Sequence, residues 1–435
     1  MITQLETLGT ALLAVAKDHR DASLATLEKE VLEVVRTILP TLLVQVIKAS
    51  ITSLQPSLSH WHKPCPSCGK RVKAQSWRQR KVTTVCGTIT YERPWFICPR
   101  CQQGFSPVDQ TLELEARMRL SEGLREWIIG LGATTSFAEA AGWLGQLTGI
   151  EVSDETVRQQ TERRGEEFEE VQERASEEVS RTQESASPLD PAPGVLVVET
   201  DGVMLRYLDG WHEVKLGVVG GHQDGKMINP SYIAARASPD VFGPRLLAEA
   251  ARRGALEVIA WRGPVMGRGL AVLREVVILG DGAPWIWNLA AEHFGERTEI
   301  IDFYHASEHI WVVAKSLYGE GTEEAKRWAG ERIQELYEKG VEPVQKALAE
   351  AEVKTKESAE VLRVERGYFR TNAARMAYPT FRARGLPIGS GAVESSAKHL
   401  VQQRMKRPGA RWSQTGAQSV LNVRSRLLSR LPLAN

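Results

Sequence analysis

Two acidic residues end apolar segments that have the character of buried strands. Asp201 ends the segment Val195–Asp201, and Asp281 ends the segment Glu275–Asp281. Carboxylate oxygens are the ligands that Mg²⁺ prefers, and two such ions can clamp the attacking and leaving oxygens of a phosphoryl displacement. Without a metal, carboxylates held that close would raise one another's pKa. The pattern therefore predicts a site for divalent cations, with a third acid still to be found.

Glu394 is the best candidate for the third acid. It follows the glycine-rich segment Gly385–Gly391 and falls in the first turns of an expected helix. The sequence from Ser395 to Asn435 then holds eight Lys or Arg and no Asp or Glu. A carboxylate beside such a basic segment is typical of a metal ligand that faces a polyanion.

Four cysteines form two pairs, Cys65 with Cys68 and Cys98 with Cys101, each with two residues between the partners. Two such tight turns can supply four sulfurs to one tetrahedral Zn²⁺. A site closed by four sulfurs leaves no position for a substrate water, so we predict a structural metal. Its binding would supply most of the folding free energy of a small module, about 10–16 kcal/mol in model zinc fingers. Cys86 is interpreted as a small buried side chain.

Basic residues gather around the cysteines. Residues 61–100 contain nine Lys or Arg and one acid, Glu92, interleaved with aromatic residues. Such an excess indicates contact with a nucleic-acid backbone, and a solvated basic face is the alternative. We predict DNA-binding residues in this segment, in the helical region that follows and near the C-terminus. They are Lys70, Arg71, Lys73, Arg78, Arg80, Lys81, Arg158, Lys398, Arg404, Lys406, Arg407 and Arg411.

Helices are expected on both sides of the cysteine region. Apolar residues spaced three and four apart predict amphipathic helices over residues 1–58, which either pack on a neighbouring domain or mediate self-association. A helix-turn-helix is expected over residues 121–165, with a capping box formed by Ser136 and Glu139 and a second helix opened by Ser153. A plain helical hairpin is the alternative to a DNA-binding one.

The acidic residues Asp201 and Asp281 require a sheet to position them. Three strands joined by hairpins, followed by alternating helix and strand, predict one mixed sheet with helices on both faces. The fold class expected is therefore multidomain α+β. The expected domains are a helical region at 1–58, a zinc ribbon at 59–108, a helix-turn-helix with an acidic linker helix at 109–190, a catalytic domain at 191–303 plus 385–435, and a helical insertion at 304–384.

Other residues near the predicted site admit more than one interpretation. Asp302 and His305 either support the active site or serve only the fold, and with Glu308 and His309 they could instead form a separate metal site. Trp285 and Trp287 either belong to the core or stack on an unpaired base.

Composition excludes several classes of protein. The chain has 435 residues, 42% of them apolar and 25% charged, which is close to an average globular protein. No apolar run approaches the 18 residues of a membrane span, and the N-terminus lacks the cationic start of a secretory signal. We therefore expect a cytoplasmic, nucleoid-associated protein with no membrane partner.

Five segments together resemble a known family. VVETDGVML, WHEVKLGVV, GDGAPWIW, IDFYHASEH and GLPIGSGAVES are similar to the bacterial insertion-sequence DDE transposases of the Kra type, which are related to the Lre type. The resemblance covers nearly the whole chain and implies an RNase H-like catalytic domain. It implies that Asp201, Asp281 and Glu394 form a metal-binding triad that cuts element ends and joins their 3′ hydroxyls to target DNA.

The resemblance completes the expected function. We predict two Mg²⁺ (or Mn²⁺) in the active site, one structural Zn²⁺, double-stranded DNA as the partner and a homo-oligomer on that DNA. The long interval between Asp281 and Glu394 is explained by a helical insertion. Two other functions remain open: a catalytically inactive, transposase-derived DNA-binding regulator, and an RNase H-like structure-selective nuclease.

Overall fold

The computed structural model describes residues 2–52, 62–182, 195–259, 270–273 and 276–433. The chain divides into two compact units, Met1–Gln160 with Ala434–Asn435, and Thr161–Leu433. The protein is thus multidomain and mixes helices with sheets, as the sequence predicts. The domain boundary expected in the proline-rich segment 185–194 lies outside the described residues.

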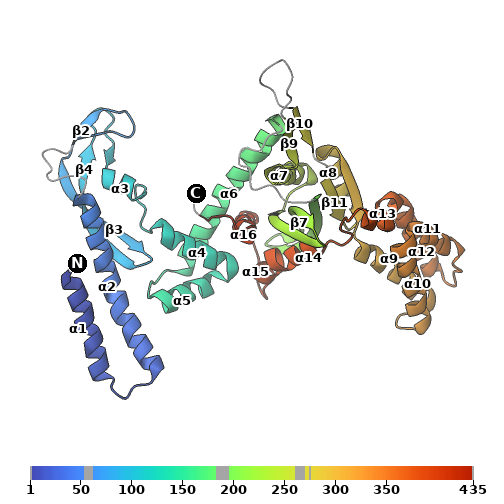
Figure 1. Cartoon of the computed structure of the whole chain (residues 1–435), viewed down its shortest axis with the longest axis horizontal. Helices are drawn as coiled ribbons and strands as arrows, with labels where there is room; N and C mark the ends of the chain where they lie inside the picture. Colours follow the sequence, from blue (N-terminus) through green and yellow to red (C-terminus); the bar gives the residue numbers. More distant parts are fainter. Residues whose placement is uncertain (1, 53–61, 183–194, 260–269, 274–275, 434–435) are drawn as a thin grey trace. The chain divides into compact units, whose positions relative to one another are not determined.

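Two helices open the first unit, α1 (Ile2–Asp18) and α2 (Leu24–Thr52), which form a hairpin (Figure 1). The second half of α2 packs on the cysteine module that follows, through Leu43, Val44 and Ile47. Leu24 and Leu32, in the first half, are exposed. The apolar stripe predicted for this region therefore covers a neighbouring module along part of its length.

The cysteine module is built from short antiparallel strands. β1 (His62–Pro64) pairs with β2 (Arg71–Lys73), and a second sheet joins β3 (Ser76–Thr84), β4 (Gly87–Ile97) and β5 (Gly104–Phe105). The short helix α3 (Pro107–Thr111) follows. Its core includes Val82, Ile89 and Phe96, which come from the central hairpin and are almost fully buried.

Three helices complete the first unit: α4 (Glu122–Thr134), α5 (Phe137–Thr148) and the start of α6 (Asp154–Thr182). The predicted capping box is present at Ser136 and Glu139, and Gly149 ends α5 in the left-handed conformation. The second helix of the pair and the acidic helix expected after it are one continuous helix, α6.

A five-stranded sheet is the centre of the second unit, in the order β12-β11-β6-β7-β8. Its strands are β6 (Val195–Tyr207), β7 (Gly210–Gln223), β8 (Lys226–Ala235), β11 (Val276–Gly280) and β12 (Arg297–Ile301). β6, β7 and β8 are antiparallel neighbours, whereas β11 is parallel to both β6 and β12. The predicted mixed sheet is therefore present, and a hairpin of β9 (Leu256–Ile259) and β10 (Leu270–Leu273) was not predicted.

Helices cover both faces of this sheet (Figure 1). α7 (Pro239–Arg252) and α8 (Pro284–His293) lie on one face, where a Cβ on Gly217 would meet α7 and one on Gly280 would meet α8. α14 (Gly391–Ser396) contacts β6 and β7, and it leads through the π-helix η3 (Ala397–Gln402) and α15 (Gln403–Met405) to α16 (Gln414–Leu428), which lies on β8.

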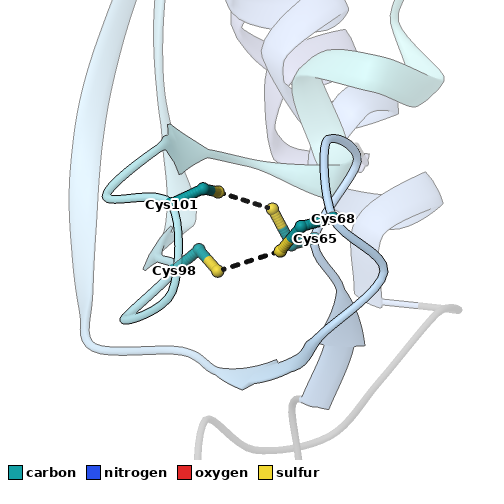
Figure 2. A group of neighbouring side chains, drawn as sticks. All are labelled: Cys65, Cys68, Cys98 and Cys101. Atoms are coloured by element: carbon teal, nitrogen blue, oxygen red, sulfur yellow. Dashed lines mark hydrogen bonds between the residues drawn. The ribbon is translucent and has the colours of Figure 1, made fainter.

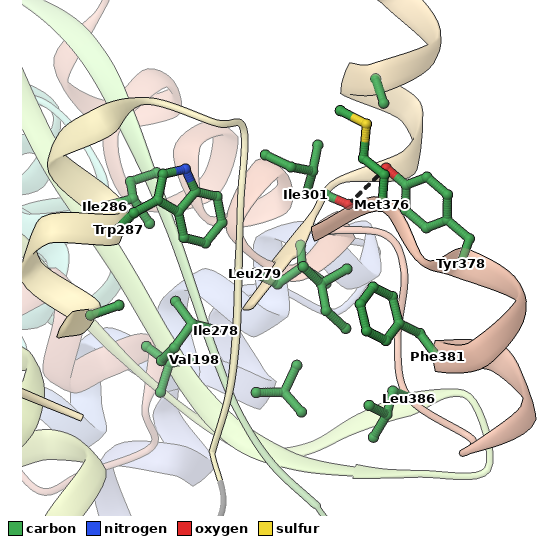
Figure 3. Close-up of a cluster of buried hydrophobic side chains, with 14 of the residues drawn as sticks. Val198, Ile278, Leu279, Ile286, Trp287, Ile301, Met376, Tyr378, Phe381 and Leu386 are labelled. Atoms are coloured by element: carbon green, nitrogen blue, oxygen red, sulfur yellow. Dashed lines mark hydrogen bonds between the residues drawn. The ribbon is translucent and has the colours of Figure 1, made fainter. Parts of the chain in front are cut away.

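A helical region lies between β12 and α14 in the sequence. It comprises α9 (Phe303–Tyr318), α10 (Glu323–Lys339), α11 (Val341–Glu350), α12 (Lys356–Thr371), η2 (Ala373–Met376) and α13 (Tyr378–Ala383). Residues 351–355 separate α11 from α12. Figure 3 shows that Met376, Tyr378 and Phe381 join the same apolar cluster as Ile278 and Leu279 of the sheet. The helical region and the sheet therefore share one core.

Candidate functional site

Three aspartates follow directly on three neighbouring parallel strands. The last paired residues of β6, β11 and β12 lie in register, and the next residues are Asp201, Asp281 and Asp302. The backbone N–H of Asp302 donates to the carbonyl of Gly280 at 2.9 Å. The sequence suggested that this strand ends at Asp201. Instead, β6 continues to Tyr207 in its hairpin with β7. What ends there is its pairing with β11, and this opens the edge that carries the acids.

The carboxylates of Asp201 and Asp281 repel each other electrostatically. Burial raises the pKa of Asp201, and the negative charge of Asp281 raises it further, while His305 acts in the opposite direction. One oxygen of each carboxylate is fixed by a backbone N–H of its own turn: Gly202 donates to Asp201 at 2.7 Å, and Ala283 donates to Asp281 at 2.8 Å. Each side chain therefore keeps a fixed orientation and a second oxygen for a ligand.

Glu394, on α14, interacts electrostatically with the same group of acids. Its pKa is raised by partial burial and then by the charges of Asp302 and Asp201, and it is lowered by His305. The three acids of the predicted triad are thus linked electrostatically, although they come from segments far apart in the chain. The π-helix η3 begins directly after α14, and such irregular turns are frequent at functional sites.

Two buried carboxylates hold the start of α14, and we refer to Glu199 and Asp302 together as the carboxylate clamp. Glu199, 3% exposed, accepts a hydrogen bond from the backbone N–H of Val393 at 2.8 Å and another from Ala392. Asp302, 1% exposed, accepts from the backbone N–H of Ser390 and, at 2.5 Å, from its hydroxyl. The clamp binds the first turn of the helix that carries Glu394, because helix N-termini present unpaired N–H groups.

Sequence reasoning missed Glu199. It lies two residues before Asp201 on β6, so both side chains point to the same face of the sheet. An acid inside an otherwise apolar buried strand was the available signal. Burial raises the pKa of Glu199 to about 7, and the charges of Asp302 and Glu394 contribute to the increase.

The acids are close but do not form a closed cage. Within the described residues, the four cysteines form the one group of three or more candidate metal ligands, and their ligand atoms all lie within 4.8 Å of one another. The carboxylates of Asp201, Asp281 and Glu394 do not form such a group. Their oxygen ligands, negative charges and open arrangement fit Mg²⁺, which keeps several waters when it binds to proteins. A dication would also relieve the repulsion that raises the pKa of Asp201 and Glu394.

The helical region supports this site from α9 and α12. The side chain of Asp302 caps α9 by accepting from the backbone N–H of His305 at 2.8 Å. His309 forms a 2.6 Å hydrogen bond with Glu365 and stacks on Tyr368 at 3.7 Å between ring centroids. The Tyr368 hydroxyl donates to the carbonyl oxygen of Asp281 at 3.2 Å. α12 therefore braces the turn that carries Asp281.

The structure distinguishes between the interpretations that the sequence left open for the residues around Asp302 and for the two tryptophans. Among the described side chains, Asp302, His305, Glu308 and His309 do not form a cluster of metal ligands. The Asp302 carboxylate is engaged by the segment before α14, and His309 by α12. Trp287 is 6% exposed and belongs to the core, against which the half-buried Trp285 packs.

The two cysteine pairs converge at the ends of the small sheets (Figure 2). The Sγ atoms of Cys65 and Cys101 are 3.5 Å apart, as are those of Cys68 and Cys98. A tetrahedron of sulfurs with metal–sulfur bonds of about 2.3 Å has edges of about 3.8 Å. Backbone N–H groups at Cys101 and Arg100 lower the pKa of Cys98 to about 6. This group can hold a metal ion.

The predicted DNA-binding residues differ in exposure. Arg80 is 8% exposed and bonds Asp109 at 3.0 Å and two backbone carbonyls, so it is structural here. Arg404 is 4% exposed and lies over the ring of Trp412. Arg158 is paired with Glu155 at 2.6 Å. The exposed ones are Lys70, Arg71, Lys73, Arg78, Lys81, Lys398, Lys406 and Arg411, and Arg407 is half-buried.

Burial of Arg80 and Arg404 corrects the prediction for those two residues. Charge alone suggested surface contacts. Asp109, which neutralises Arg80 and Arg93, lies beyond the basic segment of residues 61–100.

Among the helices of the described residues, none combines the length and apolar character needed to cross a bilayer.

Comparison with known proteins gives two similarities. The family model described as "Uncharacterised protein family (UPF0236)" matches residues 23–219. "UPF0236 protein in vanSb 3'region" from Streptococcus gallolyticus is 26% identical over 353 residues, which cover 79% of this chain and 71% of that protein. The family match includes the cysteines and Asp201 and ends before Asp281 and Glu394. The similarity to the Streptococcus protein extends over most of the chain.

Proposed function

We propose that this protein is a DDE transposase of the insertion-sequence type, which cuts DNA strands and joins 3′ hydroxyls to target DNA. One observation carries the proposal: Asp201 and Asp281 follow neighbouring parallel strands in register, and the carboxylate clamp fixes the helix of Glu394 beside them. The resemblance of five segments to transposases of the Kra type supports the same assignment.

The sheet supports an RNase H-like core. Three antiparallel strands are followed by two strands parallel to the first, and helices cover both faces. This is compatible with the catalytic domain that the resemblance implies. In this proposal the helical region of α9 to α13 is the expected insertion, and the hydrogen bond from Tyr368 to the carbonyl oxygen of Asp281 would let it support the site.

Asp201, Asp281 and Glu394 would hold two Mg²⁺ or Mn²⁺. When bound, such ions polarise the phosphoryl oxygens and lower the pKa of a coordinated water. The protein's own residues contribute by position and charge. Backbone bonds fix Asp201 and Asp281, the clamp fixes Glu394, and His305 favours the ionised forms of Asp201 and Glu394. No covalent bond between protein and DNA is required, because positioning and charge neutralisation can account for phosphoryl transfer.

The first unit would recognise DNA. We infer that the four cysteines bind a structural Zn²⁺ and form a zinc ribbon, whose exposed cations Lys70, Arg71, Lys73, Arg78 and Lys81 contact phosphates. The pair α5 and α6 would act as a helix-turn-helix. This part of the proposal predicts that log affinity falls linearly with log salt concentration, by about 0.9 for each duplex phosphate neutralised.

The proposal is tested by cleavage and strand transfer on DNA that contains the sequences flanking the coding region, with Mg²⁺ present. Asp201→Asn, Asp281→Asn and Glu394→Gln are each expected to abolish cleavage and to leave DNA binding intact. Asp224→Asn, an exposed acid in the β7–β8 turn, is the matched control and should retain activity.

Cleavage that persists when all three acids are replaced would contradict the assignment. Cleavage without strand transfer would favour a structure-selective nuclease. Binding without metal-dependent cleavage would favour a transposase-derived regulator.

A further inference from the structure

A basic pocket of about 240 Å³ opens on the second unit, between the β6–β7 hairpin and the segment that joins α15 to α16. Among the residues that line it are four cations, and none of the lining residues is an acid: Arg206, Lys406, Arg407 and Arg411. Arg206, Lys406 and Arg411 form no ion pair within the described part of the chain. Several uncompensated cations around one pocket favour a ligand that carries more than one negative charge.

Trp211 gives this pocket a second chemical character. It is directly opposite Arg206 in the β6–β7 pairing, so the two side chains lie on the same face, with Cβ atoms about 5 Å apart. The indole of Trp211 is 57% exposed beside the cations. An exposed aromatic face next to basic groups is typical of sites that stack an unpaired base while binding its phosphates.

The two walls of the pocket are joined to each other. Tyr207 forms a parallel bridge with Trp412, and the backbone N–H of Leu208 donates to the carbonyl of Trp412 at 2.9 Å. The indole N–H of Trp412 donates to the carbonyl of Met405 at 3.0 Å. These bonds fix the hairpin that carries Trp211 against the segment that carries the cations, so the pocket is a built feature of the fold.

We propose that this pocket binds an unpaired segment of a DNA strand, with its phosphates at the cations and one base stacked on Trp211. Duplex DNA satisfies the cations but hides the faces of its bases, so the exposed indole selects unpaired nucleotides. The inference rests on the proposed function for the choice of DNA as the nucleic acid.

The position of the pocket relates it to the candidate active site. Arg206 lies five residues beyond Asp201 on the same strand, about 16 Å along β6. Because five residues is an odd interval, the side chains of Arg206 and Asp201 point to opposite faces of the sheet. A strand opened next to the cleaved bond would therefore have to pass the edge of β6 to reach the pocket.

The test compares two fluorescent probes on the full-length protein: a single-stranded oligothymidine of about 20 nucleotides, and a blunt duplex of the same length. Trp211→Ala is expected to weaken oligothymidine binding roughly five- to hundredfold and duplex binding much less. Arg206→Ala is expected to reduce the salt slope of oligothymidine binding by about 0.7. The control variants are Leu208→Ala, which removes an apolar side chain that is 71% exposed in the same hairpin, and Lys226→Ala, at an exposed cation that begins β8. Both should bind like the wild type.

Two results would overturn the pocket assignment. One is unchanged oligothymidine binding by both Trp211→Ala and Arg206→Ala. The other is an equal loss on the two probes in Trp211→Ala, because stacking on an unpaired base would then be absent. A wild type that lacks metal-dependent cleavage, with selective loss in Trp211→Ala, would reject the proposed transposase and retain the pocket.

Discussion

Replacing Glu199 by glutamine separates the charge of the carboxylate clamp from its shape. Glutamine keeps one side-chain oxygen that can accept from Val393 or Ala392, and it removes a negative charge that is 3% exposed. The pKa of Glu199 is raised from 4.5 to about 7, first by burial and then by Asp302 and Glu394. The variant therefore removes a group whose ionisation opposes folding in the absence of divalent metal.

The sign of the effect follows from the two pKa values. As the pH rises, the unfolded chain loses the Glu199 proton near 4.5 and the folded protein near 7. Below about pH 4.5 Glu199 is neutral in both states, and its ionisation costs the folded protein nothing. The free energy of unfolding then falls as the pH rises from about 4.5 to about 7, and it is constant above about pH 7 with respect to this residue. The difference in pKa corresponds to about 3 kcal/mol. Loss of one hydrogen bond in the glutamine variant costs about 1 kcal/mol at every pH.

Urea denaturation without Mg²⁺ or Mn²⁺ at pH 5 and pH 8 measures this. The free energy of unfolding of Glu199→Gln, relative to wild type, is expected to be higher at pH 8 than at pH 5 by about 2–3 kcal/mol. The comparison of two pH values cancels the hydrogen-bond term. Glu352→Gln, at an exposed acid in the connection between α11 and α12, is the control and should show no such difference. Equal relative stabilities at the two pH values would refute the argument that Glu199 is a buried, repelled carboxylate.

Three further predictions concern other parts of the protein. Gly165→Ala should destabilise the second unit by about 3 kcal/mol in urea, because a Cβ there would clash with the backbone oxygen of Ser419 in α16, whereas Gly330→Ala meets open space and should be tolerated. Cys98→Ser should lose bound zinc, measured by atomic absorption, and the strands of its module should unfold. Cys86→Ser is the control and should keep the zinc and the folded strands. Zinc retained at full stoichiometry in Cys98→Ser would contradict the four-sulfur site. Tyr368→Phe should slow metal-dependent cleavage several-fold without weakening DNA binding, and an unchanged rate would show that α12 does not brace the active site.

The sheet of the second unit was predictable because its strands have simple signatures. The segment Val195–Asp201 is apolar up to its acids, the segment that becomes β11 also runs apolar into an aspartate, and β12 ends in two isoleucines before Asp302. Helices α7 and α8 each begin at a proline, which favours the first turn of a helix, so their starts are readable from the sequence. A strand or helix can be predicted from the local sequence where its apolar pattern and the residues at its ends indicate the same element.

Other features depend on partners that are distant in sequence. The role of Glu199 requires the backbone of Val393, and the burial of Arg80 requires Asp109. Neither pair has a spacing that local periodicity can reveal. The third acid of the predicted triad was selected by its basic surroundings, but only the clamp explains how its helix is held beside the sheet.

The central claim is that Asp201, Asp281 and Glu394 act together on divalent cations. The most direct measurement is anomalous X-ray scattering from a crystal of the full-length protein soaked in Mn²⁺. The account predicts a Mn²⁺ peak coordinated by Asp201 and Asp281 in the wild type, and loss of that peak in Asp281→Asn. Mn²⁺ bound elsewhere in the crystal, with none at these two aspartates, would contradict it.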